Sequence, residues 1–393
     1  MSQQPINHSP DLKRLQDEGF EVEIRAGYLL INGVPYLNSN KEIKAGTLVS
    51  ELTLTGNKTT KPNTHVVFFK GDYPCHRNGS SIEQIRHNSN QQPLTDDLVI
   101  NHSFSNKPSN GYSDYYEKMT RYIDIISAPA QSVDSSVTAK TFKVIESEDE
   151  ESVFNYIDTS SSRAGITIIA DKLKIGKVGI VGLGGTGSYV LDLVAKTPVQ
   201  EIHLFDGDKF FQHNAFRSPG APSLNELKKA QSKVAYFSEL YSKMRKKIIP
   251  HEFYINSSKI DVLRVVDFAF ICLDKGNVKE IIIDKLEKLG ISFIDVGMGV
   301  EIVDEALIGI LRVTTSTENK REHVKGKNRI SFSDGDGNDD YSRNIQIADL
   351  NALNAALAVI KWKKLFGFYQ DCEKEHHSTY TLNVNMLTGD DQL

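Results

Sequence analysis

A glycine-rich segment near the middle of the chain is the first candidate for chemistry. It reads GLGGTG at residues 182–187, with glycines at Gly182, Gly184, Gly185 and Gly187. Glycines let the backbone turn tightly and approach a ligand, and the N-terminus of a following helix offers free N–H groups to phosphate. Because the apolar run KVGIVGL precedes this segment and a helical pattern follows it, we predict a nucleotide-phosphate site here.

A carboxylate follows the next predicted strand. Asp206 ends the run EIHLFD, 19 residues beyond Gly187. An acid at this position suits hydrogen bonds to the hydroxyls of a ribose. The glycine loop and this acid fit a nicotinamide enzyme as well as an ATP-binding enzyme. An NAD-dependent oxidoreductase with a Rossmann domain is therefore an alternative on these residues.

Further charged and polar residues separate the two interpretations. They lie in DGDKFFQHNAFRSPGA, LNELKKAQSKVAYF and FICLDKGN, and they are Asp208, Asn214, Arg217, Lys233 and Asp274. With the glycine loop and in this order, they resemble the ThiF/MoeB/HesA superfamily, the adenylyltransferases that activate ubiquitin and ubiquitin-like sulfur carriers. The resemblance covers about residues 160–370. An oxidoreductase does not need Asn214, Arg217, Lys233 or Asp274.

The resemblance implies ATP and Mg²⁺ as ligands and gives each residue a role. It assigns Asp206 to the ribose and Asp274 to Mg²⁺. It assigns the phosphates to Asn214, Arg217 and Lys233, whereas Asp208 either joins this site or orders the loop after its strand. The implied nucleotidyltransferase joins AMP to the C-terminal glycine of a ubiquitin-like protein. A sulfur-carrier adenylyltransferase of cofactor biosynthesis is the alternative within the superfamily.

The charged residues suit an adenylyl transfer on physical grounds. Attack of a carboxylate on the α-phosphorus of ATP spreads negative charge over phosphate oxygens, and fixed cations near that charge are worth most in a dry site. Arg217 offers a planar fork of donors and Lys233 a compact point charge. Mg²⁺ keeps several waters and takes one or two carboxylates, and Asp274 is the candidate ligand.

The sequence departs from the family pattern at three points. Ser218 and Pro219 follow the loop arginine where the family usually has glutamine. The family often takes an arginine from the partner subunit of a dimer; Arg163 is the candidate by position, and a plain exposed arginine is the alternative. Paired CxxC zinc ligands are missing, so no metal other than Mg²⁺ is expected. We expect a homodimer built on residues 161–393, because the predicted helix 348–367 is apolar on more than one side.

A thioester, as formed by ubiquitin-activating relatives, would need a reactive cysteine. Cys272 lies in the apolar run VVDFAFICLD and is expected to be buried. Cys75 neighbours His76 and Arg77, which favour a thiolate, and Cys372 has basic and acidic neighbours. Cys75 and Cys372 are therefore the two candidates, and an ordinary cysteine is the alternative for each.

Composition excludes several classes of protein. A net charge of −5 in 393 residues argues against a dedicated nucleic-acid binder. No run of about 18 apolar residues predicts a membrane span, and the first 20 residues do not have the pattern of a secretory signal. Three scattered cysteines do not make a disulfide framework. We expect a soluble cytoplasmic protein.

Strand and helix patterns divide the chain into four parts. Residues 1–19 are expected to be a flexible tail, and 20–130 a small α+β domain, either conjugating-enzyme-like or a docking module for the ubiquitin-like partner. Residues 131–160 are Ser/Thr-rich and then acidic, typical of a linker. From 161 to 393, alternating strands and helices predict a doubly wound, mostly parallel α/β sheet. Asn225–Lys246 is expected to form one long helix. A conjugating enzyme is a further expected partner.

Overall fold

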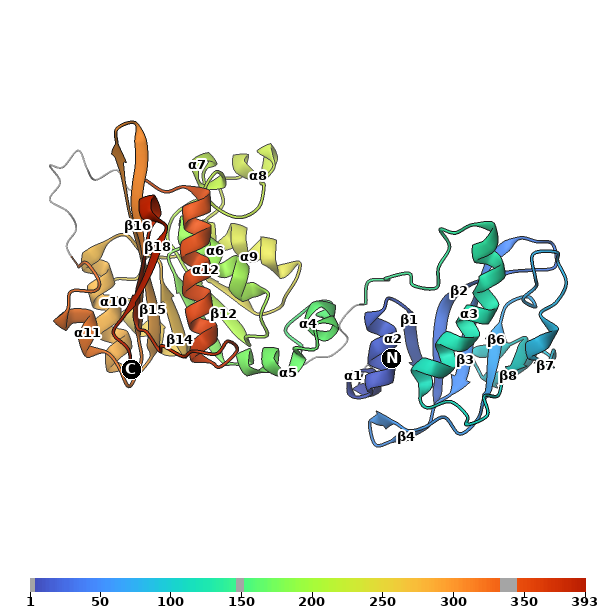
Figure 1. Cartoon of the computed structure of the whole chain (residues 1–393). Helices are drawn as coiled ribbons and strands as arrows, with labels where there is room; N and C mark the ends of the chain where they lie inside the picture. The colour runs from blue at the N-terminus through green and yellow to red at the C-terminus, as the bar shows by residue number, and fades with distance from the viewer. Residues whose placement is uncertain (1–3, 146–151, 333–344) are drawn as a thin grey trace. The chain divides into compact units, whose positions relative to one another are not determined.

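The computed structural model describes residues 4–145, 152–332 and 345–393 (Figure 1). They form two compact units, each with a hydrophobic core of its own. The N-terminal unit takes the residues up to 152 and residues 156–166, and the second unit takes 153–155 and 167–393. Among the described residues, no helix combines the length and hydropathy that a bilayer crossing requires.

The N-terminal unit is an antiparallel sheet covered by a helix. The sheet order is β1-β2-β3-β6-β10-β7, with bounds Glu21–Arg25, Tyr28–Leu37, Ile43–Glu51, Val66–Lys70, His102–Ser105 and Arg86–Asn88. Helix α3 (Tyr115–Val133) packs on β2 and β3. Two short hairpins, β4–β5 (Leu54–Thr55, Lys58–Thr59) and β8–β9 (Gln92–Thr95, Leu98–Ile100), complete the unit. The expected α+β domain is confirmed.

The expectation of a flexible tail is wrong for residues 4–17. They form helices α1 (Gln4–His8) and α2 (Pro10–Asp17). Leu12 and Leu15 are fully buried because their three-residue spacing puts both on the face of α2 that meets the core. Asp11 fastens the helix further, since its carboxylate accepts hydrogen bonds from Thr59 Oγ1 at 2.6 Å and from the N–H of Tyr115 at 3.1 Å.

The predicted linker also differs from the structure where it is described. Helix α3 continues to Val133, and the following segment lies against the N-terminal unit. The N–H of Phe142 donates to the carbonyl of Gly19 at 3.0 Å, and Lys140 pairs with Glu18 at 2.9 Å. Residues 153–155 belong to the second unit instead, where the N–H of Lys246 donates to the carbonyl of Val153 at 2.7 Å. Most of the acidic run, residues 146–151, lies outside the described residues.

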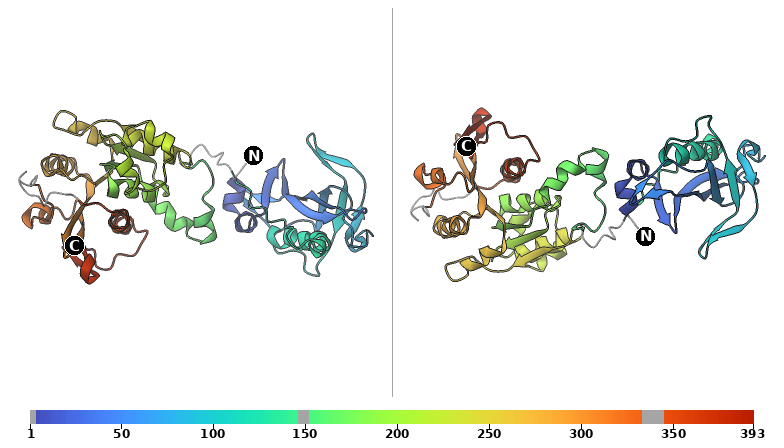
Figure 2. Two further views of the ribbon diagram at one scale, coloured as in Figure 1. Left: turned by 90° about the horizontal axis from the view of Figure 1, so that it is seen from above. Right: turned by 90° about the horizontal axis from the view of Figure 1, so that it is seen from below.

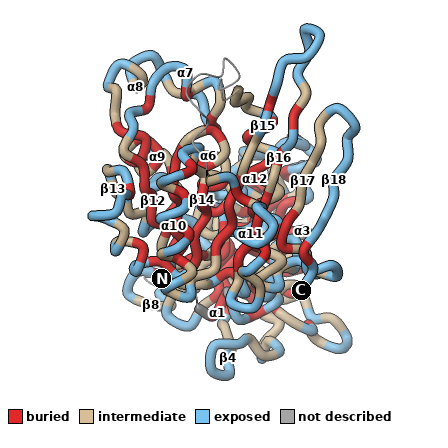
Figure 3. Tube along the Cα trace, turned by 90° about the vertical axis from the view of Figure 1, so that its left-hand side faces the viewer, coloured by how far each residue is buried: buried red, intermediate tan, exposed pale blue. Residues whose placement is uncertain are grey.

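The second unit confirms the predicted α/β fold. Its eight-stranded sheet has the order β13-β12-β11-β14-β15-β16-β17-β18, with bounds Ile248–His251, Glu201–Phe205, Lys177–Val181, Phe268–Ile271, Ser292–Val303, Ala306–Ser316, His377–Thr381 and Met386–Asp390. The strands from β13 to β15 are parallel, and those from β15 to β18 are antiparallel. Figure 3 shows the buried residues concentrated in the parallel strands and the exposed tip of the β15–β16 hairpin.

Helices cover both faces of this sheet (Figure 2). In strand β11, Val178 and Ile180 face one core and Val181 faces the other, as expected for a strand buried on both sides. The first core is covered by α6 (Gly185–Ala195), α9 (Lys233–Ser242) and α12 (Ala348–Leu365). The second is covered by α10 (Gly276–Lys288) and the 3₁₀ helix Ile260–Val265. Strand β14 therefore ends between two helical layers.

Two predicted helices can be compared with the helices of the structure. The single helix expected over Asn225–Lys246 is two helices, α8 (Leu224–Lys228) and α9, because the chain breaks at Ala230, whose φ is +46°. Helix α12 agrees with its pattern, and it packs on α6 and on β15 and β16 of the same chain. Much of the broad apolar surface of α12 is thereby covered within one chain, and Leu353 and Ile360 remain exposed.

A buried lysine in the N-terminal unit gives a test of this packing. Lys118 on α3 is fully buried and donates to Ser50 Oγ at 2.9 Å. Burial lowers the pKa of Lys118 to about 8. A folded-state pKa below the unfolded value means that the ammonium destabilises the fold at low pH, and that this cost disappears as the pH rises from about 8 to 10.5.

We predict that Lys118→Met raises the free energy of unfolding at pH 7 by up to about 3 kcal/mol, and by much less at pH 10. Urea denaturation followed by circular dichroism at both pH values measures the effect. Lys58→Met, at an exposed lysine of the same unit, is the matched control. An equal gain at the two pH values, or no gain at pH 7, would contradict the prediction.

Candidate active site

The glycine turn between β11 and α6 is packed against its surroundings at three of its four glycines. Gly182 has a φ of +91°, where other residues are strained. A Cβ on Gly187 would lie 1.9 Å from the carbonyl oxygen of Gly182, and one on Gly185 would lie 2.0 Å from the amide of Asn351. A Cβ on Gly184 would meet nothing within 4 Å. The turn is therefore closely packed at Gly182, Gly185 and Gly187, whereas Gly184, just before the first turn of α6, has open space beside it.

Asp206 ties this turn to the loop after β12. Its Oδ2 accepts a hydrogen bond from the N–H of Leu183 at 2.7 Å, and its Oδ1 accepts one from the N–H of Asp208 at 2.8 Å. The residue is only 8% exposed. Each carboxylate oxygen can accept more than one hydrogen bond, so Asp206 keeps capacity for hydroxyl donors.

Lys233 and Asp208 form an ion pair beside Asp206. Lys233 Nζ lies 2.7 Å from Asp208 Oδ2 and 3.6 Å from Asp206 Oδ2. Tyr254 donates its hydroxyl proton to Asp208, which raises the pKa of the tyrosine to about 12. Burial acts to raise the pKa of Asp208, but the hydrogen bonds from Lys233 and Tyr254 outweigh it and leave this pKa below its usual value. Of the two roles considered for Asp208, these contacts directly support the ordering of the loop.

The break before α9 explains where Lys233 lies. Ser232 is the N-cap of α9, and its hydroxyl accepts a hydrogen bond from the N–H of Ala235 at 3.2 Å. Lys233 is therefore the first residue of the helix, only 6% exposed, and its own N–H donates to the carbonyl of Asp208. A continuous helix over Asn225–Lys246 would not have provided this cap.

Asn214 and Arg217 lie in the loop after β12, near the glycine turn. Asn214, in the short helix α7 (Gln212–Ala215), is 4% exposed, and its Oδ1 accepts from the N–H of Phe211 at 2.8 Å. The carbonyl of Arg217 accepts from Asn351 Nδ2 at 3.2 Å, and Asn351 Oδ1 accepts from Thr186 Oγ1 at 3.0 Å. Asn351 thus connects the Arg217 loop to the start of α6. Arg217 Nε is buried and has no hydrogen-bond partner.

Asp274 lies at the rim of a cavity that the glycine turn borders. The cavity has a volume of about 610 Å³, and its walls include Gly184, Gly185, Asp274 and residues of β15, β16 and α12. Asp274 follows β14 and is exposed, and Gln346 Nε2 donates to its Oδ2 at 3.3 Å. Asp206, Asp208 and Lys233 do not line this cavity. The cavity therefore brings Gly184 and Gly185 together with Asp274, while Lys275, the next residue, lies 5.8 Å from the ring of Tyr254, the partner of Asp208.

Five buried or half-buried polar residues of this cavity were missed by the sequence analysis. They are Lys279, Asp295, Arg312, Asn351 and Asn354; Asp295 lies beneath the cavity wall and the other four line it. Two signals were present in the sequence. Asn351 and Asn354 interrupt the apolar pattern of residues 348–367 three positions apart, and Asp295 interrupts the apolar run ISFIDVG. A polar residue on a face that should be buried needs a partner, and it marks either a structural network or a site.

Arg163 lies in the N-terminal unit, at the end of α4 (Thr159–Arg163). Its guanidinium carbon is 5.7 Å from the centroid of the Phe142 ring. Its role as an arginine shared with a partner subunit stays a prediction.

The described residues contain no group of three or more His, Cys, Asp or Glu side chains that could hold a metal ion. A single exposed carboxylate such as Asp274 nevertheless fits Mg²⁺, which takes one or two protein carboxylates and completes its shell with water and phosphate oxygens.

The cysteines differ in accessibility. Cys75 is 2% exposed, and burial raises the pKa of its thiol. Its sulfur donates to the carbonyl of Tyr73 at 3.3 Å. Cys272 was expected to be buried inside its strand, but it follows β14, is half-buried and lines the cavity; desolvation nevertheless raises the pKa of its thiol. Cys372 is exposed. Cys75 therefore does not have the access and stabilised thiolate that its neighbours His76 and Arg77 suggested.

Two family models match parts of this chain. Residues 162–320 match the model of the ThiF family, and residues 10–159 match a domain of unknown function, DUF6791. No curated protein gives a significant match. Among solved structures, E. coli MccB with ATP is similar at 18% identity, over 60% of this chain and 69% of that chain, with a TM-score of 0.44. Selenomethionine PaaA is similar at 16% identity, over 57% of this chain and 75% of that chain, with a TM-score of 0.45.

The fold and the glycine turn thus define an α/β domain of the nucleotide-binding kind in the second unit. The family model identifies it: residues 162–320 form a ThiF family domain, preceded by the DUF6791 domain. The resemblance predicted from the sequence is confirmed at this level.

We predict that alkylation of the native protein separates the three thiols. Cys372 is exposed and should react with iodoacetamide at pH 8 at least about tenfold faster than Cys75 or Cys272, because only an accessible thiolate attacks. Peptide mass spectrometry after timed quenching reads each site, and the urea-denatured chain is the control in which the three rates converge. Fast modification of Cys75 in the native chain would contradict its burial.

Proposed function

We propose that the second unit catalyses ATP-dependent adenylylation of the C-terminal glycine carboxylate of a ubiquitin-like protein. One observation carries this proposal: the buried Asp206 joins the glycine turn to Lys233 and Asp208, and Asp274 lines a cavity that the same turn borders. The membership of residues 162–320 in the ThiF family supports the same reaction class. A dinucleotide-dependent oxidoreductase would not need Asn214, Arg217, Lys233 or Asp274.

The reaction places a carboxylate oxygen on the α-phosphorus of ATP. The new bond is a carboxyl–phosphate anhydride, the bond from the α-phosphorus to its bridging oxygen breaks, and pyrophosphate leaves with the electron pair. In the proposed site Asp206 accepts from the ribose hydroxyls, and Arg217, Lys233 and Asn214 face the phosphates. Lys233 is paired with Asp208 in the structure, so nucleotide phosphate would compete with that carboxylate. Arg217 Nε, buried without a partner, is a donor that a phosphate oxygen would satisfy.

Asp274 is the proposed Mg²⁺ ligand. When bound, the ion would neutralise charge on the phosphates that develops as pyrophosphate departs. Gln346 orients the carboxylate from one side and leaves the second oxygen available.

The N-terminal unit is proposed to dock the protein substrate or a conjugating enzyme. The burial and raised thiol pKa of Cys75 argue against a second catalytic centre there and favour binding. Where a thioester follows adenylylation, Cys372 is the exposed candidate.

We predict that the protein catalyses isotope exchange between pyrophosphate and ATP when a small protein ending in glycine is supplied. Arg217→Ala and Asp274→Ala should each lower this exchange by about 10²-fold, the scale for loss of one transition-state stabiliser. Both side chains lie in loops outside the two cores, so thermal unfolding should be nearly unchanged. Unimpaired exchange in both variants would refute the assignment.

Asp206→Asn is the companion variant for nucleotide binding. It should weaken ATP binding more than the chemical step, because a ribose contact is similar in the ground state and the transition state. Calorimetric titration of the full chain with ATP·Mg²⁺ and with NADH measures the affinity for each nucleotide. Tight NADH binding without an ATP signal would refute adenylylation and restore the oxidoreductase alternative.

We also propose that the protein is a homodimer through residues 161–393, in which Arg163 completes the site of the neighbouring subunit. Light scattering at micromolar concentration should then report about twice the chain mass of 43.9 kDa. A mixture of Arg163→Ala and Asp274→Ala subunits should recover part of the exchange that each variant lacks, because a hybrid holds one site with both residues. A monomer, or no recovery in the mixture, overturns the shared site.

A further inference from the structure

A second cavity, in the N-terminal unit, lies beside the C-terminal end of α2 and has a volume of about 230 Å³. Its wall is mostly apolar and includes Phe20, Phe142, Val144, Ile145 and Ile157. A cavity of about 150 Å³ already holds a benzene molecule, so this one has room for an apolar side chain with a polar group beside it. Ligand sites of this kind need only a few polar groups to fix the ligand.

One polar group of this cavity is a buried amide without a partner. Gln16, in the last turn of α2, is 6% exposed and lines the cavity. Within the described residues, its Nε2 finds no hydrogen-bond acceptor. A buried N–H donor in this state costs free energy, and an oxygen atom of a bound ligand would recover that cost. The cavity therefore offers a donor to a ligand oxygen.

A carboxylate and a guanidinium line the same cavity without pairing with each other. Asp17 accepts from Ser162 Oγ, which lies 2.6 Å from Oδ1 and 2.5 Å from Oδ2, and no cation among the described residues pairs with it. Arg163, the residue after Ser162, lies over the ring of Phe142 and makes no ion pair or hydrogen bond in the described part of the chain. Because the Ser162 contact brings this segment to Asp17, one small ligand can reach both charges.

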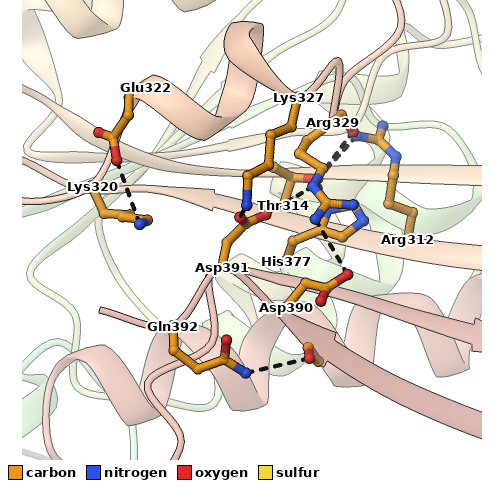
Figure 4. Close-up of polar contacts among 11 residues, drawn as sticks. Arg312, Thr314, Lys320, Glu322, Lys327, Arg329, His377, Asp390, Asp391 and Gln392 are labelled. Atoms are coloured by element: carbon orange, nitrogen blue, oxygen red, sulfur yellow. Dashed lines mark hydrogen bonds and ion pairs between the residues drawn. The ribbon is translucent and has the colours of Figure 1, made fainter.

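Paired charges elsewhere in the chain show what these two groups lack. In the second unit, Arg329 pairs with Asp391 at 2.8 Å, and Lys327 pairs with the other oxygen of the same carboxylate (Figure 4). Lys143, the other cation that lines the cavity of the N-terminal unit, pairs with Glu21 at 2.5 Å. The cavity thus keeps one anion and one cation that have no opposite charge beside them.

We propose that this cavity binds a free α-amino acid with an apolar side chain. The ammonium group meets Asp17, the carboxylate meets Arg163 and Gln16 Nε2, and the side chain lies against Phe20 and Phe142. An α-amino acid carries both charges and its side chain on one carbon atom, so a single small molecule satisfies all three polar groups. A peptide terminus has only one of the two charges. The inference goes beyond the proposed function, because it concerns the N-terminal unit alone and needs no adenylylation.

The backbone at Gly19 holds the aromatic wall of the cavity. The N–H of Phe142 donates to the carbonyl of Gly19 at 3.0 Å, and a Cβ on Gly19 would lie 2.6 Å from the Phe142 ring, so glycine is needed beneath this ring. The guanidinium carbon of Arg163 is 5.7 Å from the centroid of the same ring. Arg163 cannot hold a ligand here and serve a neighbouring subunit at the same time, so this binding competes with the shared site proposed above.

The test titrates the full chain calorimetrically at pH 6 and without ATP, with L-phenylalanine, L-phenylalaninamide and N-acetyl-L-phenylalanine as probes. At this pH free α-amines are protonated, so the amide lacks only the negative charge and the acetyl derivative only the positive charge. The wild type should bind L-phenylalanine at least about tenfold more tightly than either derivative, because each derivative loses one charge-assisted contact.

Substitutions assign each end of the ligand to its residue. Asp17→Asn should lose the preference over N-acetyl-L-phenylalanine alone, and Arg163→Gln the preference over L-phenylalaninamide alone. Gln16→Met should weaken binding of L-phenylalanine without lowering the temperature of thermal unfolding, because the donor that it removes has no partner in the free protein. Arg121→Gln, at an exposed arginine of the same unit outside the cavity, is the matched control and should bind as the wild type does.

No binding of L-phenylalanine, equal affinity for the three probes, or preferences that survive in both Asp17→Asn and Arg163→Gln would overturn the inference. Thermal unfolding verifies that each variant is folded, and Arg163→Gln, at an exposed side chain, decides if Asp17→Asn is not. None of these measurements uses pyrophosphate exchange, so the amino-acid site and adenylylation are refuted or supported separately.

Discussion

The glycine turn and the loop after β12 are fixed to each other by the two hydrogen bonds that Asp206 accepts from the backbone. One comes from the glycine turn after β11 and the other from the loop after β12. Because the same carboxylate lies 3.6 Å from Lys233, the start of α9 is drawn to the same point. The glycine turn, the loop after β12 and the start of α9 are thereby fixed around one buried carboxylate. The N–H of Gly182 adds a further anchor by donating to the carbonyl of Phe205, at the end of β12, at 2.8 Å.

Buried charge elsewhere in the second unit is matched by fixed partners. Arg245 is 1% exposed and donates to the carbonyls of Thr197 and Val199, and Lys361 pairs with Asp371 at 2.9 Å. Some buried polar atoms of this unit have no partner, among them those of Thr315, His323 and Trp362, and three such atoms lie at the candidate site. Arg217 Nε, Asn354 Oδ1 and Gln346 Oε1 belong to segments that border the glycine turn or the cavity. A buried polar group without a partner costs about 1–3 kcal/mol, and a bound ligand would recover that cost.

The sequence predicted the features that depend on local pattern. Short apolar strands, glycine-bounded turns and the order of strands and helices were enough for the doubly wound sheet and for the position of the glycine loop. Tertiary contacts decided the rest. Leu12 and Leu15 make residues 4–17 part of a core, although the segment is polar in composition, and Ser232 starts a new helix inside a continuous helical pattern. Lys279 and Arg312 had no signal of their own, because only the strand order brings α10 and β16 to Asp295.

Two groups of cations in the second unit are held by buried carboxylates. Lys233 is held by Asp206 and Asp208, and Lys279 and Arg312 are held by Asp295. In both places a carboxylate of the protein keeps cations in a fixed position. Gly184, with open space where a Cβ would stand, borders the same cavity as Lys279 and Arg312, so a ligand in that cavity can approach the backbone at the start of α6 closely.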